Sequence, residues 1–162
     1  MQRIGIGYDV HRFAGRGPVR LGGVDVPHPQ GLAGHSDADV LVHALCDALL
    51  GAAALPDIGS QFPDNDPAYK DISSLVLLAH VRMMLEEEAF EIVNVDAVVV
   101  CEAPRIGPHI PDMRRAMAEV LRIQPGRVGI KATTTEGLGA LGRGQGIAAQ
   151  AVALVRKTDT LA

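Results

Sequence analysis

The chain has 162 residues, of which 48% are hydrophobic and 21% charged, and its formal net charge is -4. These values exclude a disordered, collagen-like or fibrous chain, and the length predicts one domain over residues 1–162. Fifteen basic and nineteen acidic side chains argue against duplex DNA or an anionic membrane as a partner. With three Phe, two Tyr and no Trp, platforms for base stacking are not expected either. We therefore expect no nucleic-acid partner and no membrane partner.

The two cysteines, Cys46 and Cys101, fit no CxxC or zinc-ribbon spacing. Each lies in an apolar run, which predicts buried free thiols in a reducing compartment. The beginning of the sequence does not resemble a signal or transit peptide, and no apolar run reaches the roughly 18 residues of a membrane span. We therefore expect a cytoplasmic protein.

The first third of the chain predicts strands followed by a helix. Residues 3–10 alternate enough for a strand, and residues 19–26 fit a hairpin because Gly22 and Gly23 suit a tight turn. Ser36 or Asp37 is suited to cap a helix whose apolar residues recur at helical spacing up to residue 49. Residues 51–67 are rich in Gly, Pro and Asp and predict a long loop.

The remaining chain predicts helices over about 71–88 and 111–122, and strands over 91–101, 127–134 and 146–156. This order favours an α/β (α+β) sandwich. We expect one mixed or antiparallel sheet of about four strands, a small hairpin, and about three helices on one face of the sheet. The strands at 95–101 and 147–155 are almost continuously apolar, so the second face should also be buried. A homo-oligomer packed sheet against sheet would bury it.

A possible metal site begins at the first strand. Asp9 and His11 are two positions apart, so on a strand their side chains point to the same face. His43, on the following helix, would complete the set of two imidazoles and one carboxylate that is typical of a catalytic Zn²⁺. The alternative is an ordinary surface pair. Asp47, one turn beyond His43, fits either an outer-shell partner of the metal ligands or a solvated helix face.

Three further segments carry polar groups suited to a phosphorylated ligand. Residues 34–39 precede a helix and offer backbone N–H groups to an anion, although a simple helix cap explains them in part. Residues 56–66 form an acidic loop suited to sugar or polyol hydroxyls, or an ordinary surface loop. Residues 131–136 offer threonine hydroxyls to phosphate, and Glu136 suits a harder cation such as Mg²⁺. The run at 142–146 lacks the Lys-Ser/Thr of a P-loop, so we reject that interpretation.

Taken together, these segments resemble one family. Its motifs occur here in order as Gly7-Tyr8-Asp9-Val10-His11, Leu21-Gly22-Gly23-Val24, Gly34-His35-Ser36-Asp37-Ala38-Asp39-Val40, Asp57-Ile58-Gly59 with Phe62-Pro63-Asp64-Asn65-Asp66, and Ala132-Thr133-Thr134-Thr135-Glu136. Over about residues 3–157 the chain is similar to the 2-C-methyl-D-erythritol 2,4-cyclodiphosphate synthases of the non-mevalonate isoprenoid pathway. The resemblance implies a bacterial cytoplasmic enzyme that releases CMP from 4-diphosphocytidyl-2-C-methyl-D-erythritol 2-phosphate and closes a cyclic diphosphate.

The resemblance also implies roles for individual residues. Asp9, His11 and His43 would bind one Zn²⁺ per subunit, and Glu136 would help to place Mg²⁺ or Mn²⁺ beside the bound nucleotide. His35 and Thr134 would stabilise the transition state. The implied substrate contacts are Asp9, His11, His35, Ser36, Asp57, Ile58, Gly59, Phe62, Pro63, Asp64, Asn65, Asp66, Cys101, Ala103, Pro104, Arg105, Ile106, Gly107, Ala132, Thr133, Thr134, Thr135, Glu136 and Arg143.

The family forms homotrimers with active sites between subunits, so the resemblance implies the same assembly here. A cavity on the three-fold axis can hold an isoprenoid diphosphate, and Tyr8, Gly139, Arg143 and Gln150 correspond to its lining. Tyr8 replaces a frequent Phe, and Gln150 replaces the Glu of some relatives. Two alternatives to the synthase are a zinc-dependent phosphohydrolase and a non-enzymatic trimeric protein that binds a small ligand.

Overall fold

A mixed sheet lies at the centre of the molecule in this computed structural model, which describes residues 1–63 and 65–158. Within those residues the sheet has five strands in the order β4-β1-β7-β5-β6. They are β1 (Gln2–Ala14), β4 (Gly31–Leu32), β5 (Phe90–Val100), β6 (Val128–Thr133) and β7 (Gly146–Lys157). Only the β5–β6 pair among these is parallel. The prediction of a mixed sheet is confirmed, but the sheet has one strand more than the four expected, because β4 is too short to show alternation.

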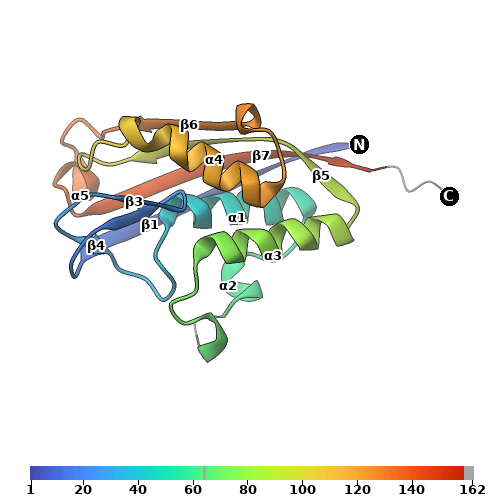
Figure 1. The fold of residues 1–162 in the computed structure, drawn as a ribbon, viewed down its shortest axis with the longest axis horizontal. Coiled ribbons are helices and arrows are strands. Elements are labelled where there is room, and N and C mark those ends of the chain that lie inside the picture. Colours follow the sequence, from blue (N-terminus) through green and yellow to red (C-terminus); the bar gives the residue numbers. More distant parts are fainter. Residues whose placement is uncertain (64, 159–162) are drawn as a thin grey trace.

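Three long helices cover one face of this sheet (Figure 1). They are α1 (Val40–Ala53), α3 (Ser74–Glu87) and α4 (Ile110–Leu121), as the apolar spacing predicted. α3 begins three residues later than expected, because Asp71 has a φ of 56° and cannot continue a helix.

The predicted loop at 51–67 contains more regular structure than expected. α1 continues to Ala53, and the four-residue helix α2 (Ile58–Gln61) follows, with Asp57 as its N-cap. A 3₁₀ turn, Pro67–Tyr69, ends the segment, and another short helix, α5 (Gly139–Gly142), lies before β7. Such short helices carry little apolar periodicity, which is why the sequence did not indicate them.

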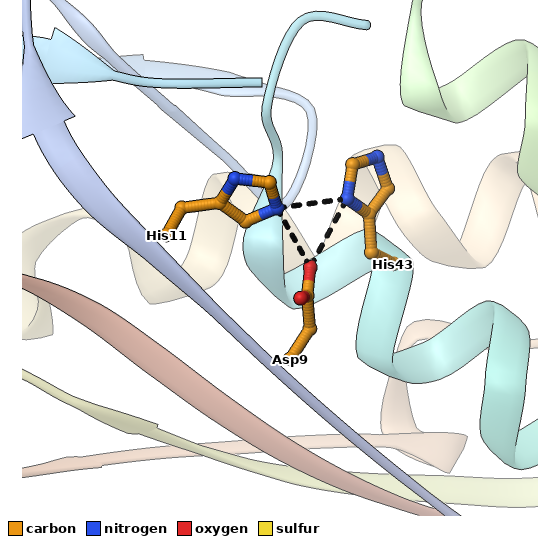
Figure 2. A group of neighbouring side chains, drawn as sticks. All are labelled: Asp9, His11 and His43. Atoms are coloured by element: carbon orange, nitrogen blue, oxygen red, sulfur yellow. Dashed lines mark hydrogen bonds and ion pairs between the residues drawn. The ribbon is translucent and has the colours of Figure 1, made fainter. Parts of the chain in front are cut away.

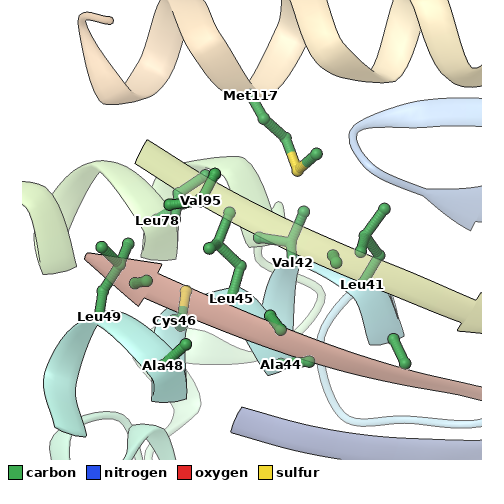
Figure 3. Close-up of a cluster of buried hydrophobic side chains, with 14 of the residues drawn as sticks. Leu41, Val42, Ala44, Leu45, Cys46, Ala48, Leu49, Leu78, Val95 and Met117 are labelled. Atoms are coloured by element: carbon green, nitrogen blue, oxygen red, sulfur yellow. The ribbon is translucent and has the colours of Figure 1, made fainter. Parts of the chain in front are cut away.

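Helix α1 lies at the centre of the core. Leu45 and Leu49 of α1 pack in one cluster with Leu78 of α3, Met117 of α4 and Val95 of β5 (Figure 3). Each of these side chains is at most 3% exposed. Removing one of the leucines from such a core destabilises a protein by about 2–5 kcal/mol.

The opposite face of α1 lies almost directly on β1. A Cβ atom built on Gly7 would lie 2.8 Å from the backbone nitrogen of Ala48 and closer still to the carbonyl oxygen of Ala44. Glycine is therefore required at this position of β1, because any side chain would push the helix away. This close approach also brings His43 of α1 next to the side chains of β1.

The predicted hairpin is present as β2 (Val19–Leu21) and β3 (Val24–Val26), joined by Gly22 and Gly23. Its turn is fixed by Asp39, whose buried carboxylate accepts hydrogen bonds from Gly22 N at 2.9 Å and Gly23 N at 2.7 Å. Asp39 also accepts from Val42 N at 3.1 Å and is the N-cap of α1. The cap is thus Asp39 rather than Ser36 or Asp37, whose side chains bond elsewhere.

The face of the sheet turned away from the helices carries exposed apolar side chains. This outer face consists of Ile4, Ile6, Tyr8, Val10 and Val152, which are between 41% and 72% exposed. Ile4, Ile6, Tyr8 and Val10 alternate along β1 with residues that face the helices, and Val152 lies on the neighbouring strand β7. In the single chain, the second face is therefore apolar, as predicted, but uncovered.

Both cysteines are buried free thiols, as predicted. Cys46 lies within α1, and Cys101 directly follows β5. Among the helices of the described residues, none combines the length and the apolar character needed to cross a membrane.

Candidate metal centre and ligand cavities

Asp9, His11 and His43 meet at one point between β1 and α1 (Figure 2). Asp9 Oδ2 lies 2.8 Å from His11 Nε2 and 3.1 Å from His43 Nδ1, and the two ring nitrogens are 3.3 Å apart. In the described part of the chain, this is the group of His, Cys, Asp and Glu side chains whose geometry suits a metal ion. The sequence prediction that these three side chains converge is confirmed.

The alternating direction of side chains along β1 explains why these three side chains converge. Asp9 and His11 occupy alternate positions that face α1, and His43 lies in the first turn of that helix. The three side chains are partly buried, with 28%, 17% and 13% of their surface exposed, respectively. They therefore form the floor of a recess that remains accessible to a ligand.

Backbone contacts determine the orientation of the His11 ring. Its Nδ1 donates to the carbonyl oxygen of Ala33, so in the neutral ring Nε2 carries a lone pair directed at Asp9. Burial alone would lower the pKa of His11, but the hydrogen bonds to Asp9 and Ala33 outweigh this effect and raise it. For Asp9, burial is the largest single influence and favours a higher pKa, but the hydrogen bonds and charge interactions with His11 and His43 together outweigh it and lower the pKa.

A carboxylate oxygen and two imidazole nitrogens within 3.3 Å of one another require positive charge among them. A bound cation would supply this charge. Nitrogen and oxygen ligands of this kind fit Zn²⁺ or a similar transition metal.

The outer side of His43 contacts two hydroxyl groups. Its Nε2 lies 2.9 Å from Ser74 Oγ and 3.0 Å from Ser36 Oγ. Ser74 in turn donates to Asp37 Oδ1. No sequence pattern indicated this role for Ser74, because it is 31 positions from His43 and resembles any serine at the start of a helix.

A cavity of about 280 Å³ opens above these ligands. We call it the His43 cavity. It is lined by Asp9, His11, Gly34, His35, Ser36, His43, Asp47, Ile58, Gly59, Phe62, Tyr69, Ile72 and Leu77. The structure thus brings the metal ligands together with five of the residues expected to contact substrate, namely His35, Ser36, Ile58, Gly59 and Phe62. Tyr69, Ile72 and Leu77 were not predicted, because apolar residues in helical patterns are usually core residues.

His35 has a notable position in this cavity. Its Nε2 is buried and has no hydrogen-bond partner among the described residues. A buried polar atom without a partner is unfavourable by about 1–3 kcal/mol unless a ligand or water satisfies it. This ring nitrogen is therefore available to a bound ligand.

Asp47, on α1, forms a hydrogen bond to the loop that follows this helix. Its Oδ1 accepts from Ile58 N at 2.8 Å, which fixes the start of α2 beside the metal ligands. Asp57 caps α2 by accepting from Ser60 N at 2.7 Å, and this hydrogen bond lowers the pKa of its exposed carboxyl. Asp57, Pro63, Asn65 and Asp66 do not line the His43 cavity, although they flank residues that do. Asp64 lies outside the described residues.

A second hollow of about 590 Å³ lies where β5 and β6 end side by side. We call it the Cys101 cavity. Its lining residues are Cys101, Glu102, Pro104, Arg105, Ile106, Gly107, Pro108, Ile110, Ala132, Thr133 and Thr134. The parallel pairing of β5 with β6 therefore brings the predicted segments 101–107 and 132–134 together. Ala103, Thr135, Glu136 and Arg143 do not line this hollow.

Glu102 shapes the turn after β6. Its Oε1 accepts from Thr135 N at 3.1 Å and from Gly137 N at 3.3 Å. Between them, Glu136 adopts a φ of 54° and exposes its side chain. Thr134 Oγ1 lies 3.5 Å from Glu136 Oε1, so the two predicted functional groups are neighbours.

The two cavities share no lining residue. The metal ligands and His35 belong to one, and Thr134 belongs to the other. Within a single chain, the predicted site is therefore divided between two separate surfaces.

Comparisons with known proteins fit this arrangement. The YgbB family profile matches residues 2–156. The 2-C-methyl-D-erythritol 2,4-cyclodiphosphate synthase of Syntrophomonas wolfei is 57% identical over 155 residues, which cover 96% of this chain and 99% of the relative.

Solved structures show the same fold. The bifunctional IspDF of Campylobacter jejuni superposes with a TM-score of 0.94 at 38% identity, covering 98% of this chain and 43% of that one. The CDP complex of IspF from Plasmodium falciparum superposes with a TM-score of 0.85 at 30% identity, covering 98% and 97%. The profile match and these full-length similarities show that the chain belongs to the YgbB family, that of the 2-C-methyl-D-erythritol 2,4-cyclodiphosphate synthases.

Proposed function

We propose that this protein converts 4-diphosphocytidyl-2-C-methyl-D-erythritol 2-phosphate to 2-C-methyl-D-erythritol 2,4-cyclodiphosphate and CMP. An oxygen of the 2-phosphate attacks the β-phosphorus, a new P–O bond forms, and the bond between that phosphorus and the oxygen of CMP breaks. This makes the protein a phosphorus–oxygen lyase of isoprenoid precursor synthesis. The synthases named above support this reaction, and they support neither a phosphohydrolase nor a binding protein.

The observation that carries the proposal is the convergence of Asp9, His11 and His43 at the floor of a cavity lined by ligand-binding groups. A Zn²⁺ bound there would act as a Lewis acid and withdraw charge from a phosphate oxygen. The attacking group is already an anionic phosphate, so no strong general base is needed. What the protein must supply is charge neutralisation and correct placement of two anions.

The residues of the His43 cavity suit the phosphate and polyol part of the substrate. The unpartnered His35 Nε2 is suited to contact a phosphate oxygen, and Ser36 lies beside it with a hydroxyl. Ile58, Gly59 and Phe62 form an apolar wall that would exclude water from the reacting groups. We assign the other loop contacts, Asp57, Pro63, Asp64, Asn65 and Asp66, to the same part of the substrate on the basis of the motif alone.

The Cys101 cavity suits the nucleotide. Thr133 and Thr134 offer hydroxyl groups, Arg105 offers a cation, and Ile106 offers an apolar surface. We assign Thr134 to stabilisation of charge at the transferring phosphate. The exposed Glu136 beside it suits Mg²⁺ or Mn²⁺, which prefer carboxylate oxygens and phosphate. A solved relative is described as a CDP complex, which supports a cytidine nucleotide as part of the substrate.

A homotrimer would bring the two cavities together. Because the two cavities share no lining residue within one chain, we infer that a neighbouring subunit places the nucleotide beside the metal ligands. The exposed apolar outer face supplies a surface for such packing around a three-fold axis. Tyr8 and Gln150 are paired across β1 and β7 on that face, so in a trimer they would line an axial cavity. We propose that Arg143 binds an isoprenoid diphosphate at the mouth of that cavity.

We also propose that the protein is a single domain that works in the cytoplasm. The two cysteines are free thiols, which a reducing compartment preserves.

The proposal is tested by adding the diphosphocytidyl substrate to the zinc-loaded protein with Mg²⁺ and following ³¹P resonances. We expect the substrate signals to be replaced by those of CMP and a cyclic diphosphate, with no phosphate monoester other than CMP. Release of CMP together with a linear methylerythritol 2,4-bisphosphate, with one oxygen taken from ¹⁸O-labelled water, would identify a hydrolase instead. Unchanged substrate in the presence of both metals would contradict the proposal.

A further inference from the structure

Ser74 lies buried between a carboxylate and a metal-binding imidazole. Its side chain is 0% exposed, at the first residue of α3. Its Oγ contacts Asp37 Oδ1 on one side and His43 Nε2, at 2.9 Å, on the other. Asp37, Ser74 and His43 therefore form a chain of hydrogen bonds that ends at the metal site.

The Asp37 carboxylate is held in place by donors. Its Oδ2 accepts from Ser74 N at 2.9 Å and its Oδ1 from Asp39 N at 3.2 Å. Arg20 Nε lies 4.0 Å from Oδ2 and adds positive charge. The backbone N–H groups of Ser74 and Asp39 and the guanidinium of Arg20 thus present hydrogen-bond donors or positive charge to this carboxylate, as expected of an ionised group.

The direction of each hydrogen bond from Asp37 through Ser74 to His43 indicates which ring nitrogen of His43 carries a proton. Ser74 has one hydroxyl proton, and the carboxylate of Asp37 takes it, because a carboxylate accepts but does not donate. The oxygen of Ser74 is then an acceptor toward His43 Nε2, and Ser36 Oγ, 3.0 Å from the same nitrogen, can accept as well, so a proton on Nε2 satisfies both contacts. In a neutral ring this leaves a lone pair on Nδ1, the atom that faces Asp9 Oδ2 and His11 Nε2.

We propose that Asp37 and Ser74 are positioning residues that hold His43 in the Nε2–H tautomer and so prepare Nδ1 to bind the metal. The common arrangement in metal sites is a carboxylate or carbonyl bonded directly to the imidazole. Here the hydroxyl of Ser74 lies between the carboxylate of Asp37 and the imidazole of His43. The inference rests on the proposed metal site. The sequence patterns indicated Asp37 only as a possible helix cap and indicated no role for Ser74.

Asp37→Asn is the main test, because it preserves shape and changes the direction of the hydrogen bonds. Its amide can donate to Ser74 Oγ, which frees the serine proton to point at His43 Nε2. We expect the proton of His43 to move to Nδ1, where it blocks the metal-binding lone pair. Side-chain ¹⁵N chemical shifts of the metal-free protein, compared with those of the parent protein at the same alkaline pH, report which nitrogen carries the proton.

Zinc affinity gives an independent readout that needs no substrate. Competition with a chromophoric chelator should show the zinc dissociation constant raised about 10–100-fold in Asp37→Asn, the usual effect of losing an outer-shell partner. Asp25→Asn is the matched control, since Asp25 also pairs with Arg20, at 3.0 Å, but is remote from His43. It should keep both the tautomer and the affinity of the parent protein.

Variants at Ser74 distinguish an effect on the positioning of His43 from a general loss of folding. Ser74→Ala removes the hydroxyl and should weaken zinc binding as Asp37→Asn does, whereas Ser74→Thr keeps a hydroxyl and should restore most of the affinity. If Asp37→Asn and Ser74→Ala both leave the ¹⁵N pattern of His43 unchanged, the proposal is wrong. If the tautomer responds but the parent protein binds no zinc, the positioning role stands and the proposed metal function fails.

Discussion

The side chains of Asp9 and His43 are separated by 34 positions in the sequence, yet Asp9 Oδ2 lies 3.1 Å from His43 Nδ1. The contact exists because α1 lies directly on β1, where Gly7 leaves room for the helix backbone. The metal centre therefore depends on the packing of a helix on a strand as much as on its three ligands. Each level of this arrangement can be tested.

His43→Ala should abolish turnover and greatly reduce bound zinc, because two ligands remain where three are needed. The loss of zinc affinity should exceed the roughly 10–100-fold expected for an outer-shell residue. Bound metal is measured by mass spectrometry after gel filtration. His28→Ala, at a histidine that lines neither cavity, is the control. Normal zinc content in His43→Ala would refute the assignment.

Glu136→Gln should weaken the dependence on the second cation and leave zinc in place. Loss of one anionic oxygen ligand should raise the half-saturating Mg²⁺ concentration about tenfold, because Mg²⁺ strongly prefers carboxylate to amide oxygen. Mg²⁺ and Mn²⁺ titrations of turnover measure this change, with the exposed Glu119→Gln as control. A titration curve that matches the parent protein would remove Glu136 from the site.

Gly7→Ala should separate α1 from β1. The added Cβ would overlap the carbonyl oxygen of Ala44, and overpacking of this kind destabilises a protein by about 1–3 kcal/mol or more. Urea unfolding should show the loss of stability, and zinc affinity should fall with it, since His43 moves with the helix. Gly126→Ala adds the same methyl group where no atom lies within 4 Å and should change neither quantity.

Ile6→Glu tests the role of the outer face. Ile6 is 62% exposed in the single chain, and burying a carboxylate there would be strongly unfavourable. Light scattering should give a mass about three times 17.1 kDa for the parent protein and a lower mass for the variant. Val76→Glu changes an apolar residue on α3 that is 43% exposed and should not alter the mass. A monomeric parent protein would contradict the trimer.

Alkylation of Cys101 should depend on pH in an unusual way. Burial, together with the nearby charge of Glu102, raises the pKa of its thiol to about 11. Since the thiolate is the reactive form, the rate of iodoacetamide labelling should rise about tenfold per pH unit up to about pH 11. Glutathione, an unburied thiol, should level off earlier. Mass spectrometry of the peptide that contains Cys101 measures the rate, and a plateau by about pH 9 would contradict this pKa.

Much of the fold could be predicted from local pattern. The strand at β1 and the three long helices follow from apolar periodicity, and the hairpin follows from Gly22 and Gly23. The alternation of β1 also placed Asp9 and His11 on one face before any coordinates were known. In contrast, the short elements β4, α2 and α5 contain too few residues for a periodic signal.

The sequence by itself determined which residue types could bind a metal and which segments could form strands and helices, because those properties repeat over a few neighbouring positions. Only the tertiary structure decided that Ser74 stands between Asp37 and His43, that Asp39 rather than its neighbours caps α1, and that the implied site is divided between two cavities. These facts depend on contacts between segments that are far apart in the chain, and no local pattern encodes the distance between two such segments.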